Sequence, residues 1–285
     1  MLAFRDVVAN IRRAVVGMGL LADERDPLSV VIMGTGFLVH PDGWIMTNRH
    51  VAELFRGERD GRVGIRNAVA RAVLFVQAAG REIPGQGRAA VAGFGAIPCP
   101  IVEVAMPPVA PDVAPHYESA PDLAVCRINI EGLDRMGVPR PAHLELGNSQ
   151  NVRTGDEIGI LGFPLGLTLT GEEAALRQMT PIAQKGVIAA VLPFGDAVNP
   201  HAFQLDMNIN GGSSGSPLFV AETGEVVGVV FAARVAPHEV AVQTPEGPQT
   251  IATVPLPTGF GYAVPINRYR EQPGRVHRMP PVIHD

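Results

Sequence analysis

The chain has 285 residues, of which 46% are hydrophobic and 18% charged, a composition typical of a globular protein and not of a disordered one. Acidic residues outnumber basic ones by 28 to 23, so the net charge of −5 gives no electrostatic reason to expect a nucleic-acid partner. With 32 glycines and 26 prolines, the chain is expected to contain many turns and short elements, which excludes a helical bundle.

The two cysteines, Cys99 and Cys126, are too few for a disulfide scaffold. Cys126 lies in the apolar run 123–128, where we expect a buried free thiol. No stretch resembles a membrane-spanning helix, and Arg5 and Asp6 interrupt the N-terminal region in a way that a signal peptide does not tolerate. We therefore expect a cytoplasmic protein without a membrane partner.

The expected elements begin with a helix and continue as short strands. Apolar residues recur at helical spacing over residues 4–18, which predicts one amphipathic helix. Residues 36–47 predict a hairpin around the turn Pro41-Asp42-Gly43. The other expected strands are residues 29–33, one or two within 63–76, and then 123–128, 157–161, 186–191, 217–220, 225–232 and 261–265.

Three segments are expected to be mostly irregular. Residues 79–121 contain many prolines and are predicted to be long connections around one or two short strands. Residues 238–257 are predicted to be a polar surface loop, and residues 268–285 a tail. Many short strands with few helices predict an all-β fold with a closed sheet. No repeat or clear linker divides the chain, so we expect one domain over residues 1–285.

The most informative motif for chemistry is Asn210-Gly211-Gly212-Ser213-Ser214-Gly215-Ser216-Pro217. A nucleophilic serine must project from a tight turn whose N–H groups point toward the developing oxyanion. Glycines before and after Ser214 permit such a turn because they tolerate positive φ. By itself, this motif is more typical of a glycine–serine hairpin loop.

Two further motifs strengthen the interpretation. His50 follows an expected strand in Thr47-Asn48-Arg49-His50, a good position for a general base. Asp122 opens the apolar run 123–128, so its carboxylate is expected at the mouth of that strand. Either residue alone is more often structural, but the ordered set of His50, Asp122 and Ser214 is much rarer. The remaining histidines lack metal-ligand spacing, and we expect neither a metal nor a cofactor.

Together these motifs resemble the trypsin/chymotrypsin-fold serine proteases, and in particular the HtrA (Deg) branch. The similarity runs over about residues 4–267 and is carried by Gly34-Thr35-Gly36-Phe37, Thr47-Asn48-Arg49-His50-Val51, Asp122-Leu123-Ala124-Val125, Gly162-Phe163-Pro164, Gln204-Leu205-Asp206, Gly212-Ser213-Ser214-Gly215 and Gly259-Phe260-Gly261-Tyr262-Ala263-Val264-Pro265.

The resemblance implies an N-terminal helix in residues 1–19 and two six-stranded antiparallel β-barrels, at about 20–140 and 141–267. It implies that Ser214 attacks a peptide carbonyl, that His50 transfers the proton and that Asp122 orients His50, with an acyl-enzyme intermediate. The N–H groups of Gly212 and Ser214 would form the oxyanion hole. The implied substrate pocket comprises Asn208, Phe231, Ala232, Ala233 and Gly259, and has no acidic residue to select arginine or lysine.

The chain also departs from the family pattern. The 20 residues after Pro265 are too few for the PDZ module that HtrA proteins usually carry, so we expect none. Ser213 stands where an aspartate often precedes the nucleophile, so we expect no activation by zymogen cleavage. Residues 169–181 are predicted to be an inserted loop, which suggests an enzyme that rests until a partner binds.

The sequence therefore favours a serine endopeptidase that acts on proteins or peptides. Two alternatives remain: an inactive protease fold that serves as a binding or scaffold protein, and an esterase. An activating partner and a homo-oligomer are both compatible with the sequence.

Overall fold

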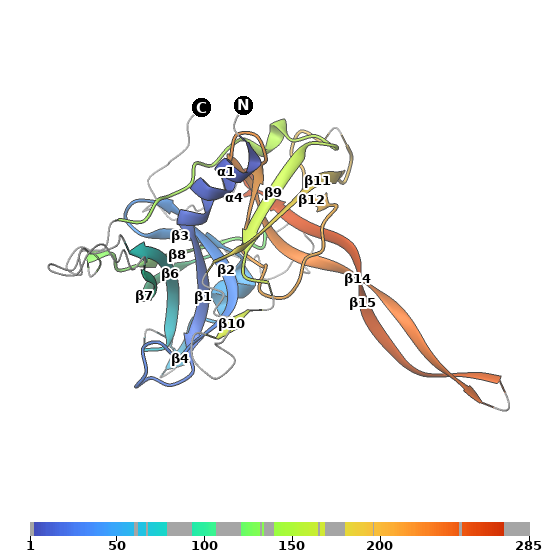
Figure 1. Ribbon diagram of the computed structural model, residues 1–285, viewed down its shortest axis with the longest axis horizontal. Coiled ribbons are helices and arrows are strands. Elements are labelled where there is room, and N and C mark those ends of the chain that lie inside the picture. Colours follow the sequence, from blue (N-terminus) through green and yellow to red (C-terminus); the bar gives the residue numbers. More distant parts are fainter. Residues whose placement is uncertain are drawn as a thin grey trace, which may run out of the picture.

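The structure is a computed structural model that describes residues 3–59, 62–66, 68–78, 93–106, 121–131, 133, 140–164, 166–168, 180–195, 197–244 and 247–270. Two β-barrels lie side by side, and a long hairpin projects from the second barrel (Figure 1). This arrangement confirms the all-β double barrel expected from the sequence.

The first barrel closes because its first strand pairs on both sides. β1 pairs with β2 along one edge and with β6 along the other. A short strand, β10 (Leu167–Thr168), adds to the free part of β2, and β4 (Arg56–Arg59) with β5 (Arg62–Ile65) forms a separate ribbon. The strands of the closed circuit are β1 (Val15–Leu21), β6 (Ala70–Ala78), β7 (Gly93–Ala105), β8 (Ala124–Ile128), β3 (Trp44–Thr47) and β2 (Val30–His40).

The second barrel is also a closed circuit of antiparallel strands. Its apolar interior includes Phe203, Ile160 and Val230, which are almost fully buried. The strands, in order around the barrel, are β11 (Ile182–Leu192), β12 (Ala202–Leu205), β15 (Gly247–Pro265), β14 (Val226–Thr244), β13 (Pro217–Val220) and β9 (Glu157–Gly162).

The N-terminal helix is shorter than predicted. α1 covers Phe4–Ile11, a 3₁₀ turn covers Arg12–Ala14, and the chain is already in β1 from Val15. The strand form prevails because Gly17 and Gly19 lie against β2; a Cβ on Gly19 would stand 2.1 Å from the Val31 carbonyl oxygen. The first barrel therefore begins at Val15 and not near residue 20, and the helical spacing of Val15 and Met18 is coincidental.

The described helices outside α1 are short. They are α2 (Arg49–Glu53), a 3₁₀ turn (Ser149–Asn151) and α4 (Asn267–Arg270). Within the described residues, no helix has the length and apolar character that crossing a membrane requires.

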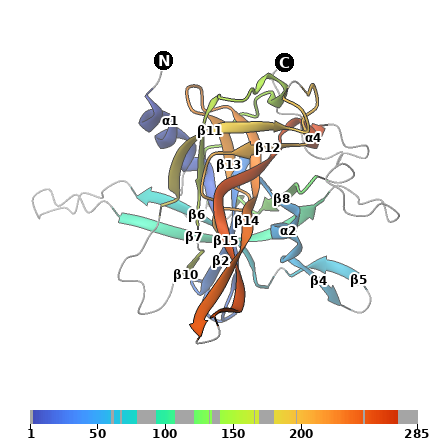
Figure 2. The ribbon, with the colours of Figure 1, turned by 90° about the vertical axis from the view of Figure 1, so that its right-hand side faces the viewer.

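Residues 238–257 are not the surface loop predicted from the sequence. Residues 238–244 belong to β14 and residues 247–257 to β15, each strand being 19 residues long, and the two strands pair with one another far beyond the barrel (Figures 1 and 2). The prediction was wrong because it took the prolines and polar residues as loop signals. Here Pro237 lies opposite Pro255 in an isolated ribbon, where no third strand requires the missing N–H groups.

The other strand predictions hold, with changed limits. The expected runs 29–33 and 36–40 form the single strand β2, and its hairpin with β3 is confirmed. The segment predicted as short strands contains β7, which has 13 residues, while residues 79–92 and 107–120 lie outside the described residues. Residues 169–179 of the predicted inserted loop lie outside them too. The strands β1, β4, β10 and β12 were not predicted.

The connection between the barrels contacts both of them. The amide of Leu144 donates to the Leu38 carbonyl in the first barrel, at 2.8 Å, and the amide of Gly147 donates to the Val226 carbonyl in the second, at 2.9 Å. This extended segment therefore helps to hold the two barrels in one orientation.

Candidate active site

His50 and Asp122 meet in the first barrel. The Nδ1 atom of His50 lies 2.7 Å from Oδ2 of Asp122, and the His50 amide donates to Oδ1 at 3.0 Å. Because a carboxylate only accepts hydrogen bonds, Nδ1 carries a proton and Nε2 is left as the basic nitrogen. About half of the His50 side chain is exposed, at 49%, so a reacting group can reach it.

The position of Asp122 follows from its place directly before β8. β8 pairs with β3, and the chain after β3 turns through Asn48 into α2, which carries His50. The Asn48 side-chain amide donates to the Asp122 carbonyl at 2.8 Å, so the main chain at Asp122 is held from the same turn. Burial lowers the pKa of the neighbouring Arg49, while the carboxylates of Glu53 and Asp122 act in the opposite direction.

The Ser214 turn lies between β12 and β13. The Ser213 amide donates to the Asn210 carbonyl at 3.1 Å, and the positive φ of Gly212, 85°, falls on the third residue of this turn, as a type II turn requires. At Gly215, φ is 89°, and an added Cβ would stand 1.8 Å from the Thr35 carbonyl oxygen. Both glycines therefore serve the turn in the way the sequence suggested.

Among the amides of this turn that have no hydrogen-bond partner within the described residues are those of Gly212 and Ser214. They are the pair that the resemblance implied for an oxyanion hole. Free amide donors next to a serine are what a tetrahedral oxyanion requires, because they stabilise the negative charge as it develops.

The turn is held by Thr35, which the sequence analysis named in a motif but to which it gave no role. The Thr35 hydroxyl donates to the Gly212 carbonyl at 2.8 Å and accepts from the Phe163 amide at 3.0 Å. Its own carbonyl accepts from the buried hydroxyl of Thr47 at 2.7 Å. A small polar residue between two glycines, Gly34 and Gly36, was the only sequence feature that indicated a structural role for Thr35. Its hydrogen-bond partners could not be inferred because they lie far away along the chain.

The same contact region brings Ser214 beside the helix that carries His50. The Thr35 amide donates to the Ser214 carbonyl at 2.8 Å. A Cβ on Gly34 would lie 2.8 Å from the Val51 side chain and 3.4 Å from the Ser214 carbonyl oxygen, so Gly34 separates Val51 from Ser214. Among the described residues, Ser214 Oγ donates to the Phe231 carbonyl, at 3.4 Å, and makes no hydrogen bond with His50.

The residues expected to form the substrate pocket are on neighbouring elements. Residues 231–233 lie on β14, and Ala232 and Ala233 pair with Tyr262 and Gly261 of β15. A Cβ on Gly259 would have the Asn208 side-chain oxygen 3.9 Å away, so Asn208 approaches β15 there. The Phe231 carbonyl meets the Ser214 hydroxyl, which places β14 next to the nucleophile.

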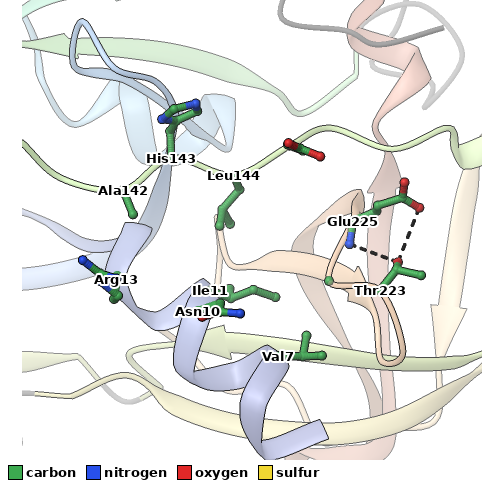
Figure 3. Close-up of a pocket in the computed structure, with 11 residues that line it drawn as sticks. Val7, Asn10, Ile11, Arg13, Ala142, His143, Leu144, Thr223 and Glu225 are labelled. Carbon is green, nitrogen blue, oxygen red and sulfur yellow. Dashed lines mark hydrogen bonds between the residues drawn. The ribbon is translucent and has the colours of Figure 1, made fainter. Parts of the chain in front are cut away.

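A separate groove of about 380 Å³ lies where α1 meets the second barrel (Figure 3). Val7, Ile11 and Leu144 contribute apolar side chains, and His143 and Thr223 stand on opposite sides of it. None of the residues proposed for catalysis lines this groove. The described part of the chain also holds no cluster of three side chains able to bind a metal ion.

Known proteins with similar sequences are proteases. The chain is 27% identical over 245 residues to the magnetosome formation protease MamE of Magnetospirillum gryphiswaldense, which matches 85% of this chain and 22% of that protein. It is 28% identical over 219 residues to a probable periplasmic serine endoprotease, DegP-like, of Chlamydia pneumoniae, matching 74% of this chain and 31% of the relative. The chain thus spans less than a third of these relatives' length.

The structural comparison agrees with the fold. A variant of the HtrA-type protease AlgW, solved with a tripeptide, superposes with a TM-score of 0.50 at 19% identity, over 95% of this chain and 62% of that one. The resemblance to the HtrA branch expected from the motifs is confirmed. The pattern of the trypsin-like peptidase domain matches residues 34–229, well over half of the chain, and the chain therefore belongs to the trypsin-like peptidase family.

Proposed function

We propose that the protein is a serine endopeptidase in which Ser214, His50 and Asp122 form a catalytic triad. The observation that carries the proposal is the 2.7 Å contact between His50 Nδ1 and Asp122 Oδ2, made on the side of the barrel where the Ser214 turn is attached. The two unpartnered amides of Gly212 and Ser214 support it, because they supply the donors that acyl transfer needs.

In the proposed mechanism, the Ser214 hydroxyl leaves the Phe231 carbonyl and turns to His50 Nε2. Such contacts often tighten only when substrate binds. Ser214 Oγ attacks the scissile carbonyl carbon, and His50 accepts its proton and passes it to the leaving amine. Asp122 holds the ring and stabilises its charged form. Water then attacks the acyl-enzyme by the same route, which releases the product and restores Ser214.

The proposed preference is for a small or medium apolar residue immediately before the cut. The pocket proposed for this residue combines Asn208, the β14 residues 231–233 and Gly259, none of which is acidic. A substrate arginine or lysine would find no carboxylate there, whereas an apolar side chain loses nothing on desolvation. A peptide-library profile dominated by arginine or lysine would contradict this preference.

The first test is labelling of the purified protein with a fluorophosphonate, followed by intact mass and peptide mapping. One adduct on Ser214 is expected, and it should disappear in Ser214→Ala and in His50→Ala. Ser216→Ala is a matched control, because this neighbouring hydroxyl is buried and has no hydrogen-bond partner; it should label as the wild type does. An unlabelled wild type would contradict the proposal and favour a binding or scaffold role.

Labelling alone does not separate a peptidase from an esterase. Hydrolysis of casein and of a short peptide amide, compared with hydrolysis of the corresponding ester, makes that distinction. We expect the wild type to cleave both amide substrates. Neither Ser214→Ala nor His50→Ala should cleave them. Ester hydrolysis without amide hydrolysis would assign the protein to the esterases.

A further inference from the structure

The hairpin of β14 and β15 extends well beyond the barrel that anchors it. β14 pairs with β13 only over residues 226–229, and β15 pairs with β12 only over residues 261–263. From Val235 to Thr244, β14 pairs with β15 alone. Figure 1 shows this hairpin projecting away from both barrels, and in Figure 2 it points toward the viewer.

The pairing register assigns the side chains of this hairpin to two faces. Ala236 pairs with Leu256, His238 with Val254, and Val240 with Ala252. Paired residues share a face and alternate residues along a strand do too, so these six residues lie on one face. Beyond a register shift after Val240, Val242 continues this face on β14, opposite Gln249 of β15. We call it the apolar face; it comprises Ala236, His238, Val240, Val242, Ala252, Val254 and Leu256, all apolar except His238.

The apolar face is exposed to solvent. Val240 is 39% exposed, Val254 40% and Leu256 44%. The face carries no lysine, arginine, aspartate or glutamate. A two-stranded ribbon is only marginally stable in water by itself, so covering the apolar side chains on its face would stabilise it. A ligand that covers this face is therefore expected to be apolar.

The edges of the hairpin are poor docking sites by comparison. Pro237 pairs with Pro255, and Val235 with Pro257. Two opposed prolines have no N–H to exchange, so this is a non-hydrogen-bonded pair whose N–H positions point outward. The prolines thus remove donors from both outer edges, which is how edge strands avoid added strands. An occupant would bind through the face and not through the edge.

The size of the face argues against a stable dimer of hairpins. From Ala236 to Val242, the strand extends about 20 Å, and two strands are about 10 Å wide, which makes a footprint of roughly 200 Å². A stable protein interface needs about 800 Å² on each partner. A footprint this small suits one extended segment of chain.

The hairpin that carries this face is continuous along β14 with the proposed active site. The Gly215 amide donates to the Val230 carbonyl at 2.8 Å, and the Ser214 hydroxyl contacts the Phe231 carbonyl on the same strand. β14 therefore runs from the nucleophile directly into the hairpin. We propose that the apolar face is an exosite that binds an extended, apolar stretch of the protein substrate while another part of the same chain occupies the active site. This inference rests on the proposed endopeptidase function.

The test compares the double variant Val240→Ser/Val254→Ser with the control Val235→Ser. Val235 is 54% exposed and lies on the opposite face, so its substitution removes at least as much exposed apolar surface as either single change. Binding of fluorescent casein is measured by anisotropy in a Ser214→Ala background, which needs no catalysis. The double variant should raise the Kd roughly tenfold, about threefold for each half-exposed valine, and the control should leave it unchanged.

Kinetics with an intact Ser214 give the second readout. The double variant should raise KM for casein roughly tenfold with kcat unchanged, and leave the hydrolysis of a four-residue chromogenic peptide unaffected, because that peptide does not reach the hairpin. Cleavage of neither substrate by the wild type would refute the endopeptidase function, while the anisotropy would still test the exosite.

Three outcomes would overturn the exosite. The first is a casein Kd that is the same in the double variant and the wild type, or that the control raises equally. The second is a wild-type dimer in sedimentation that the double variant dissociates, which would assign the face to a second copy. The third is binding to phosphatidylcholine vesicles that the double variant abolishes while its casein affinity is retained.

Discussion

The substitution Thr35→Val tests how the barrels together position the Ser214 turn. The Thr35 hydroxyl is fully buried and joins the Gly212 carbonyl to the Phe163 amide. Valine has nearly the same shape but neither donates nor accepts a hydrogen bond. The variant therefore leaves a carbonyl and an N–H without their partner, and Gly212 loses the contact that holds its peptide group.

The expected effects follow from these two hydrogen bonds. Each buried polar group that is left without a partner costs about 1–3 kcal/mol. Thr35→Val leaves two such groups, but the half-buried Gly212 carbonyl recovers some hydration, so the free energy of unfolding should fall by about 2–4 kcal/mol. Complete loss of one oxyanion-hole donor costs roughly 10²–10³ in kcat. A loosened Gly212 is a milder defect, and we expect kcat to fall about tenfold with KM unchanged.

Urea denaturation and steady-state hydrolysis of a chromogenic peptide measure the two effects separately. Thr47→Val is the matched control, because the Thr47 hydroxyl is also buried but bonds the Thr35 carbonyl and not the Ser214 turn. It should lower stability by about 1–2 kcal/mol with little change in kcat. Thr35→Ser should restore most of the activity. Equal kcat values for Thr35→Val and Thr47→Val would refute the positioning role of Thr35.

Further predictions concern the site and the core. Asp122→Asn should lower kcat by about 10⁴ while the fold is retained, because the His50 tautomer is no longer set; circular dichroism and peptide hydrolysis check this. Gly215→Ala should prevent folding, since the added Cβ would lie 1.8 Å from the Thr35 carbonyl oxygen. Gly155 also has a positive φ, 94°, but nothing lies within 4 Å of an added Cβ, so Gly155→Ala should lower the free energy of unfolding by only about 1 kcal/mol. Thermal melts of the two variants check this difference. Burial raises the pKa of Cys99 from 9.0 to about 11 and that of Cys126 to about 12, so a thiol reagent at pH 8 should modify neither until the protein unfolds. Between pH 9 and 11 the thiols ionise mainly in the unfolded protein, so the free energy of unfolding should fall as the pH rises through this range. Urea denaturation curves that show the same stability at pH 9 and pH 11 would contradict this prediction.

The chemistry-bearing motifs could be found without the structure because each is compact in the sequence. Glycines next to Ser214 and an aspartate at the start of an apolar strand are local features, and their order along the chain is informative. His50 and Asp122 are separated by 72 positions along the chain, so their pairing could be expected only from the resemblance. The open amides of Gly212 and Ser214 depend on backbone orientation, which residue types do not specify.

Local patterns misled where tertiary pairing competed with them. Val15 and Met18 continue the helical spacing of α1, yet they lie in β1 because that strand pairs with β2 over residues 15–21 and with β6 over residues 17–20. The prolines of residues 238–257 predict a loop, yet the two-stranded ribbon tolerates Pro255 and Pro257 at outward-facing positions. In both segments the hydrogen-bonding partner lies elsewhere in the chain, so no local window contains the deciding information.

Turn-forming glycines and strand-forming runs act over short distances along the chain. Residue types alone therefore indicate a β-rich globular protein and mark His50, Asp122 and Ser214 as the residues of interest. Two features become visible only in the folded protein: Thr35 links the Ser214 turn to the first barrel, and β14 continues into a hairpin with one apolar face. Both features arise from contacts between distant segments, whose geometry depends on how the strands close into barrels.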